Sequence, residues 1–318
     1  MINLGLIGIG RWGVNYLNTL RTFKDINISY VCSKTKKGLD NVSNLIEKNI
    51  NKTTDYREVI EDKNIDAIAI TSPGSTHFQF AKEALENNKH IIVEKPVAFN
   101  SKNIQELIKL SEGKNRVFMS GHIHLFNPPI NKIKNDIHTG LFGKLKYIHT
   151  TGTGNGPVRE DISALWDFFP HDVSILTYLL DSIPIKINTS GHSTLNKNID
   201  VVSLEMEYPN NIKSYSFASW TYPIKKRDVV IISENILSSF QDYSNNKLVY
   251  TNRKTNEVID KFQYLLGTKP LTNQLNHFIE CIKNNKKPLT DGEHTLKVTK
   301  ILESAQKSLE LNKPIDLN

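Results

Sequence analysis

Cysteine is scarce in this chain, with only Cys32 and Cys281 among 318 residues, far apart and without the spacing of a metal site. Such scarcity is typical of a reducing compartment, and we expect no metal centre. Long apolar runs are missing too, since none approaches the roughly 20 residues that cross a bilayer. A strand-like segment begins directly after Met1 and leaves no room for a signal peptide. We therefore expect a cytoplasmic protein with no membrane partner.

Dense blocks of basic residues are also missing, although 40 Lys and Arg against 33 Asp and Glu give a net charge of +7. The lysines are spread through predicted helices and turns, without interleaved aromatic residues, so nucleic acid is not an expected partner. Phosphates of a cofactor or substrate would use the same charge locally. A hydrophobic fraction of 38% is enough for real cores, and the length predicts about two domains.

A glycine-rich turn follows the first apolar run. Residues 2–7 read as a strand, residues 8–13 spell G-I-G-R-W-G, a helix follows to about residue 22, and residues 28–32 read as a second strand. In this context the motif is typical of dinucleotide binding. Gly8 would form the tight turn, Gly10 would let the backbone approach a pyrophosphate, and Gly13 would allow close packing of the helix. The alternative is that the three glycines serve turns only.

Ser33 holds the place, about 20 residues past the glycines, where an acidic side chain would bind the ribose 2′-hydroxyl of NAD. Lys34, Lys36 and Lys37 follow it. No carboxylate is there to repel a 2′-phosphate, and cations are at hand to pair with one. The pattern therefore favours NADP over NAD. The alternative is an ordinary basic turn, with NAD bound without the acidic contact.

Strands and helices continue to alternate through residue 121. Helices are predicted at residues 40–49, 56–62 and 77–88, and from an N-cap at Ser101 to about residue 112; further strands are predicted at 65–71, before Glu94, and at 116–120. The alternation predicts an α/β domain with a doubly wound parallel sheet, residues 1–121. Thr71, Ser72 and Pro73 would lie at the carboxyl edge, where such sheets bind ligands. His77 would orient this turn or face the cofactor.

Glu94 and Lys95 end a buried strand at the same edge. A lysine held partly out of water is suited to proton transfer or to polarising a hydroxyl. The alternative is a solvated strand end with no chemical role.

The second half, residues 122–318, has another pattern. We predict a helix to about residue 139, a strand at 144–153, a loop at 154–157 and a helix through residue 180. Asp167 and His171 are four residues apart, so in a helix they share one face and the carboxylate could orient the imidazole. Strands are predicted at 185–191, 201–208, 213–220, 228–233, 247–251 and 257–262, with helices at 271–284 and 292–311. These segments predict an α+β domain with a large open, mainly antiparallel sheet, whose free face would pair copies into a homodimer or homotetramer.

Six motifs, taken together and in order, resemble the glucose-fructose oxidoreductase / inositol dehydrogenase (Gfo/Idh/MocA) family over nearly the whole chain. They are Gly8-Ile9-Gly10-Arg11-Trp12-Gly13, Ser72-Pro73 with His77, Glu94-Lys95-Pro96, Gly121-His122 with Phe126-Asn127-Pro128, Trp166-Asp167 with Pro170-His171-Asp172, and Pro288-Leu289-Thr290-Asp291-Gly292.

The resemblance implies a Rossmann domain, a C-terminal domain on a large open sheet, and oxidation or reduction of a sugar or cyclitol hydroxyl with NAD or NADP. It assigns Lys95 to the place between nicotinamide and substrate, and Asp167 and His171 to the acid/base pair. The residues expected at the cofactor are Gly8, Gly10, Arg11, Trp12, Gly13, Ser33, Lys34, Thr71, Ser72, Pro73, His77, Glu94 and Lys95. Those expected at the substrate are Lys95, Asn127, Arg159, Asp167 and His171, with Arg159 a candidate clamp for substrate phosphates or a loop salt bridge.

The Trp-Asp-x-x-Pro-His-Asp form looks most like members that act on nucleotide-linked sugars, such as dehydrogenases of UDP-N-acetylglucosamine at C3. In the expected mechanism His171 takes the hydroxyl proton while hydride passes to nicotinamide. Alternatives are a free polyol or inositol dehydrogenase, an NADPH-dependent sugar ketoreductase, and a non-catalytic dinucleotide-binding regulator. The retained Lys95, Asp167 and His171 argue against the regulator.

Overall fold

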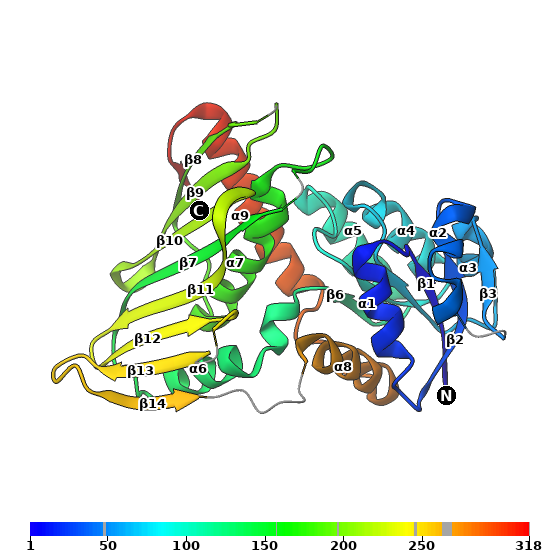
Figure 1. Cartoon of the computed structure of the whole chain (residues 1–318), viewed down its shortest axis with the longest axis horizontal. Helices are drawn as coiled ribbons and strands as arrows, with labels where there is room; N and C mark the ends of the chain where they lie inside the picture. The colour runs from blue at the N-terminus through cyan, green and yellow to red at the C-terminus, as the bar shows by residue number, and fades with distance from the viewer. Residues whose placement is uncertain (47–48, 157, 196, 245–246, 263–268, 318) are drawn as a thin grey trace. The chain divides into compact units, whose positions relative to one another are not determined.

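The computed structural model describes residues 1–46, 49–156, 158–195, 197–244, 247–262 and 269–317 (Figure 1). The chain forms two compact units. The first contains Met1–Ile123 and Lys269–Leu296, and the second contains His124–Thr268 and Lys297–Asn318. The segment 269–296 therefore belongs to the first unit although it follows the second in the sequence.

The first unit is built on a six-stranded parallel sheet with the order β3-β2-β1-β4-β5-β6. Its strands are β1 (Ile2–Ile7), β2 (Ile26–Cys32), β3 (Asn51–Thr53), β4 (Ala67–Ile70), β5 (His90–Val93) and β6 (Phe118–Ser120). The central strands are apolar and buried, as expected for a sheet covered on both faces. The strand order reverses between β1 and β4, and ligands bind at such a reversal in open α/β sheets.

Helices cover both faces of this sheet (Figure 1). They are α1 (Arg11–Leu20), α2 (Lys36–Asp40), α3 (Tyr56–Glu61), α4 (Gly74–Glu86), α5 (Ser101–Gly113) and α8 (Pro270–Asn284). The predicted doubly wound α/β fold is confirmed in this unit.

Three local predictions for the first unit were wrong. In place of the helix expected at 40–49, the chain forms α2 and then a single 3-10 turn at Ser43–Leu45. Helix α2 begins at Lys36 because the Thr35 hydroxyl accepts a hydrogen bond from the Gly38 amide. Residues 47–48 of the expected helix lie outside the described residues. Asn100, not Ser101, caps α5, with its side chain accepting from the Asn103 amide. Helix α4 begins earlier than expected, at Gly74.

The second unit is built on a nine-stranded sheet with the order β14-β13-β12-β11-β7-β10-β9-β8-β15. Its strands are β7 (Leu145–Asn155), β8 (Lys186–His192), β9 (Val201–Tyr208), β10 (Ile212–Ser219), β11 (Thr221–Ser233), β12 (Ile236–Gln241), β13 (Leu248–Asn252), β14 (Val258–Phe262) and β15 (Ile315–Asp316). Strands β7 and β10 run parallel, and the other described pairs run antiparallel. The predicted open, mainly antiparallel sheet is confirmed.

Three local predictions for the second unit were wrong. Strand β12 was not predicted, and β11 begins at Thr221 rather than at residue 228. The loop expected from residue 154 starts later, because Gly154 still lies in β7. Pro157, the end of that expected loop, lies outside the described residues.

Helices α6 (Pro128–His138) and α7 (Ala164–Leu180) pack together, and α7 lies against β7, β9 and β10 (Figure 1). A buried ion pair links α7 to β11: Arg227 Nη1 is 3.0 and 2.9 Å from the two carboxylate oxygens of Asp172. Because an unpaired charge at this depth would be costly, the pair fixes where α7 lies on the sheet. The last long helix, α9 (Gly292–Leu311), runs from the first unit into the second.

The two faces of the large sheet differ. Along β7, Ile148 and Thr150 are fully buried, whereas Tyr147 and His149 on the opposite face are partly exposed, and the His149 ring stacks on Tyr215 of β10. Pairing of subunits through this second face stays a prediction. Among the described residues, no helix is long and apolar enough to cross a membrane.

Candidate active site

The glycine turn has the geometry that the motif predicts. Gly8 has a φ of +103°, which favours glycine, and a Cβ there would lie 2.4 Å from the Ser72 amide nitrogen. A Cβ on Gly13 would lie 2.0 Å from the Gly8 carbonyl oxygen, so α1 packs too closely on the turn for a side chain. No described atom lies within 4 Å of the position that a Cβ on Gly10 would take. Gly10 precedes α1, and this open backbone next to a helix N-terminus fits a dinucleotide pyrophosphate.

Thr71 joins the turn to the neighbouring strand. Its amide donates to the Ile7 carbonyl oxygen and its hydroxyl to the Gly8 carbonyl oxygen. Thr71 therefore lies at the reversal of strand order between β1 and β4. It directly follows β4, at the carboxyl end where it was predicted.

Glu94 fixes the first turn of α1 to the end of β5. Its Oε1 accepts from the Trp12 indole nitrogen at 2.7 Å and from the Tyr16 hydroxyl at 2.8 Å, and the Tyr16 oxygen accepts from Gln274 Nε2. Burial raises the pKa of Glu94, while the two donors oppose the rise. Glu94 is only 7% exposed, so its carboxylate holds Trp12 in place, whereas the indole is 38% exposed and accessible to a ligand.

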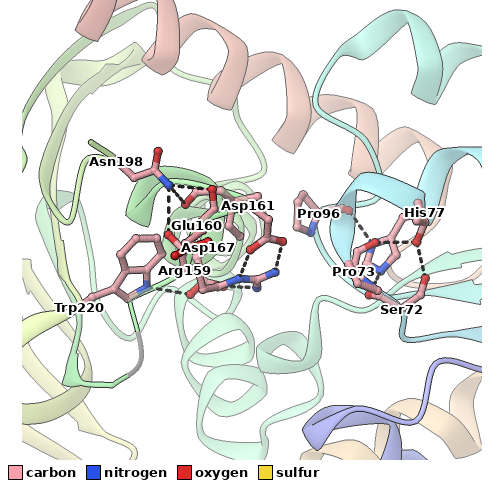
Figure 2. A network of polar contacts seen from close by, with 12 residues as sticks. Ser72, Pro73, His77, Pro96, Arg159, Glu160, Asp161, Asp167, Asn198 and Trp220 are labelled. Atoms are coloured by element: carbon pink, nitrogen blue, oxygen red, sulfur yellow. Dashed lines mark hydrogen bonds and ion pairs between the residues drawn. The ribbon is translucent and has the colours of Figure 1, made fainter. Parts of the chain in front are cut away.

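His77 connects the β4 and β5 ends. Its Nδ1 lies 2.8 Å from the Pro96 carbonyl oxygen and its Nε2 lies 2.7 Å from the Ser72 carbonyl oxygen (Figure 2). The imidazole is 2% exposed, so it orients these turns, one of the two roles predicted for it. Lys95 immediately precedes Pro96 and is partly exposed, with its amide donating to Glu94 Oε2.

Ser33 follows directly on β2, where the residue that contacts the ribose is expected. Ser33 is buried, its amide donates to the Thr53 carbonyl oxygen, and a Cβ on Gly38 would lie 2.1 Å from its hydroxyl oxygen. Lys34 and the two lysines that begin α2 are exposed. The lysines expected to pair with a 2′-phosphate are therefore exposed, whereas Ser33 itself is buried.

In the second unit, Asp167 and His171 both lie on α7, one turn apart, as predicted. The two oxygens of Asp167 have separate donors: Arg159 Nη1 is 3.4 Å from Oδ1, and the Trp220 indole nitrogen is 3.0 Å from Oδ2 (Figure 2). Trp220 was not predicted, because it lies 53 residues from Asp167 in the sequence and no local pattern connects them.

Arg159 is held as a loop salt bridge, one of the two roles considered for it. Its Nε and Nη2 bind the two carboxylate oxygens of Asp161 at 2.9 and 2.6 Å. Asp161 is the main cause that raises the pKa of Arg159, and the guanidinium in turn lowers the pKa of Asp161. Most of the donors of Arg159 are thus engaged within the chain, which weakens its candidacy as a phosphate clamp.

Two further residues complete this region. Asn127, expected at the substrate, is 1% exposed and donates to Asp242 Oδ1 at 3.3 Å, so it braces the β12–β13 turn. His124 was not expected at the site, yet its ring lies edge to face on His171 with the centroids 4.7 Å apart. Among the described residues, no group of three or more His, Cys, Asp or Glu could hold a metal ion.

The structure therefore brings the predicted residues together as two sets. The first set lies in the first unit and consists of the glycine turn, Thr71, Ser72, His77, Glu94 and Lys95. The second set lies in the second unit and consists of Asn127, Arg159, Asp167 and His171. The first set, on a doubly wound parallel sheet, defines a dinucleotide-binding protein of the Rossmann class.

Comparison with known proteins agrees with this class. Residues 2–122 match the model of the oxidoreductase family with an NAD-binding Rossmann fold, named for Gfo, Idh and MocA. The predicted resemblance to the glucose-fructose oxidoreductase / inositol dehydrogenase family is thereby confirmed, and the chain is an oxidoreductase.

Some relatives align with almost the full length of the chain. The uncharacterised oxidoreductase YrbE of Bacillus subtilis is 26% identical over 98% of this chain and 96% of its own. The scyllo-inositol 2-dehydrogenase (NAD(+)) of the same organism is 26% identical over 93% of this chain and 90% of its own. The structure of UDP-N-acetylglucosamine 3-dehydrogenase from Acidithiobacillus ferrooxidans superposes with a TM-score of 0.85, 20% identity and 98% coverage of each chain, which shows a shared fold.

Proposed function

We propose that this chain is an NAD(P)-dependent dehydrogenase that transfers a hydride between the hydroxyl-bearing carbon of a sugar or cyclitol and nicotinamide. The observation that carries the proposal is the pair Asp167 and His171 on one helix, with both oxygens of the carboxylate held by N–H donors. An imidazole one turn from a fixed carboxylate is suited to general acid/base work on a hydroxyl. The activities of the related inositol and UDP-N-acetylglucosamine dehydrogenases support this substrate class.

In this proposal each residue has a separate task. His171 accepts the hydroxyl proton as the alcohol is oxidised, Asp167 orients its imidazole, and Lys95 polarises the hydroxyl. The glycine turn, with Gly10 open and the N-terminus of α1 beside it, binds the pyrophosphate. The bound nicotinamide supplies the hydride acceptor.

The cofactor proposal is NADP in preference to NAD. It rests on Ser33 in place of a carboxylate and on the exposed Lys34, Lys36 and Lys37 that follow. A 2′-phosphate would find cations here, whereas the ribose 2′-hydroxyl of NAD would find no acidic acceptor.

We expect Lys34→Ala to weaken NADPH binding by about tenfold or more, the loss of one charge-assisted hydrogen bond, and to leave NADH binding nearly unchanged. Dissociation constants for the two reduced dinucleotides, measured by calorimetry, test this. Lys109→Ala removes an exposed lysine from α5 and serves as the control. Equal effects of Lys34→Ala on both dinucleotides would leave the lysines as an ordinary basic turn.

Two substrate classes remain under this function. The Trp166-Asp167 and Pro170-His171-Asp172 form supports a nucleotide-linked sugar such as UDP-N-acetylglucosamine, oxidised at C3. The ion pairs of Arg159 favour the second class, a free polyol or inositol, because the residue considered for the substrate phosphates is already bound by Asp161 and Asp167.

One assay separates these classes. The purified protein is offered NAD and NADP separately, each with UDP-N-acetylglucosamine, its uronate, inositols and free hexoses, and absorbance at the reduced-nicotinamide band is followed. We expect reduction of the dinucleotide with at least one sugar or cyclitol. Turnover of UDP-sugars alone would support the nucleotide-sugar class, and turnover of free polyols alone would contradict it.

The same assay run with NADPH or NADH and the corresponding keto-sugars tests a ketoreductase. A chain that binds dinucleotide but turns over no substrate in either direction would be the non-catalytic regulator, and the dehydrogenase proposal would be wrong.

A further inference from the structure

Trp220 holds Asp167 from a different part of the fold than Arg159 does. Its indole nitrogen lies 3.0 Å from Asp167 Oδ2, and its side chain is buried at 3% exposure between β10 and β11 (Figure 2). The Trp220 amide donates to the Asp200 carbonyl oxygen, and the Trp220 carbonyl oxygen accepts from the Gly156 amide. The indole therefore comes from a backbone that is anchored on both sides, on the sheet rather than on α7.

The loop that carries Arg159 is anchored as well. Asn198 Nδ2 donates to the carbonyl oxygens of Arg159 and Glu160 at 3.1 and 3.0 Å, while Asp161 binds the guanidinium at two positions (Figure 2). The guanidinium thus approaches Asp167 Oδ1 from a fixed loop. Two elements, each anchored by hydrogen bonds, hold the two oxygens of one carboxylate.

The chemistry of the two donors favours one form of the Asp167 carboxyl group. An indole N–H and a guanidinium only donate hydrogen bonds, so both stabilise an acceptor with lone pairs. Hydrogen bonds of this kind favour the ionised carboxylate. They also fix its plane, and a side chain that is 20% exposed would otherwise rotate.

We propose that Trp220 and Arg159 are positioning residues that hold Asp167 as an oriented carboxylate, and that this orientation makes Asp167 effective on His171. The proposal rests on the function proposed above for Asp167 and His171. It adds a residue that the motifs do not contain, Trp220, and gives Arg159 a task within the site.

The contact itself is tested without any turnover. The chain has three tryptophans, so an amide correlation spectrum of 15N-labelled protein shows three indole signals, assigned with Trp12→Phe, Trp166→Phe and Trp220→Phe. We expect Asp167→Ala to move the Trp220 indole proton to higher field, because the hydrogen bond is lost, and to leave the Trp12 signal in place, because Trp12 donates to Glu94. An unmoved Trp220 signal would overturn the proposal even if the enzyme were active.

The catalytic consequence is tested by kinetics. Trp220→Phe keeps a large ring and removes the donor, and we expect kcat to fall about 10- to 100-fold with KM little changed, as for one hydrogen bond to a charged group. Tyr208→Phe also removes a buried donor from this sheet, one that bonds to Met206 rather than to Asp167, and is the control, with kcat within about threefold of wild type.

A double-variant comparison distinguishes positioning from a structural effect. In an Asp167→Ala background, Trp220→Phe is expected to lower kcat no further, because the residue it positions is gone. Additive losses would overturn the proposal. Arg159→Lys keeps the positive charge but not the several N–H donors of the guanidinium. We expect Arg159→Lys to lower kcat less than Arg159→Ala does, which is a partial rescue. If no substrate turns over, the proposed function fails, while the indole spectrum still decides whether Trp220 holds Asp167.

Discussion

Lys95→Ala is expected to bind dinucleotide while its kcat falls by about 10²- to 10⁴-fold. The structure separates the two effects. The backbone of Lys95 follows β5 and its amide donates to the buried Glu94 carboxylate, and neither feature depends on the lysine side chain. Trp12 and the glycine turn stay in place because Glu94 holds the indole. The variant removes the ammonium group, which we propose acts on the hydroxyl, together with the methylene groups that carry it.

Two measurements check this result. Dissociation constants for NADH and NADPH should agree with wild type within about threefold, and steady-state kinetics should show the loss in kcat. Lys102→Ala removes an exposed lysine from the start of α5 and should leave both unchanged. If Lys95→Ala kept more than about a tenth of wild-type turnover, Lys95 would be a solvated strand end, the alternative that its sequence position also allows.

The first unit was predictable because its signals are local. Strand β1 has the predicted bounds, Ile2–Ile7, since an apolar run ends at a glycine that must adopt a positive φ. The position of Glu94 after β5 follows in the same way from a buried run that stops at a charge. Predictions failed where signals were weak or doubled. Strand β3, which was not predicted, is short and polar, and Asn100 and Ser101 are consecutive residues that both suit an N-cap.

The second unit shows why pairing over long sequence distances defeats local reasoning. Strand β12 carries serines at Ser238 and Ser239, so its apolar signal is diluted although Ser238 is buried. The spacing of Asp167 and His171 predicts their shared helix face, because four residues in a helix make about one turn. The donors to the Asp167 carboxylate could not be predicted in this way, because only the folded sheet brings the Trp220 indole, 53 residues away in the sequence, to Asp167.

Two glycines of the first turn differ in the space available for a side chain, which allows folding and binding to be tested separately. A Cβ on Gly13 would meet the Gly8 carbonyl oxygen at 2.0 Å and the Thr71 hydroxyl at 2.9 Å, and backbone cannot give way as a flexible side chain can. A Cβ on Gly10, whose φ is −81°, would meet no described atom within 4 Å. The pyrophosphate is expected to pass over Gly10.

We therefore expect Gly13→Ala to lower the free energy of unfolding by about 1–3 kcal/mol, as overpacking does, and to abolish dinucleotide binding by distorting the turn. Gly10→Ala should unfold at the same denaturant concentration as wild type, yet bind NADH and NADPH at least about tenfold more weakly, because its methyl group occupies the approach of the pyrophosphate. Urea titrations and calorimetry measure the two quantities. Gly113→Ala, at the end of α5 and equally open, is the control that changes neither. Wild-type binding by Gly10→Ala would show that the phosphates do not lie over this residue, and the glycine turn would then serve the fold alone.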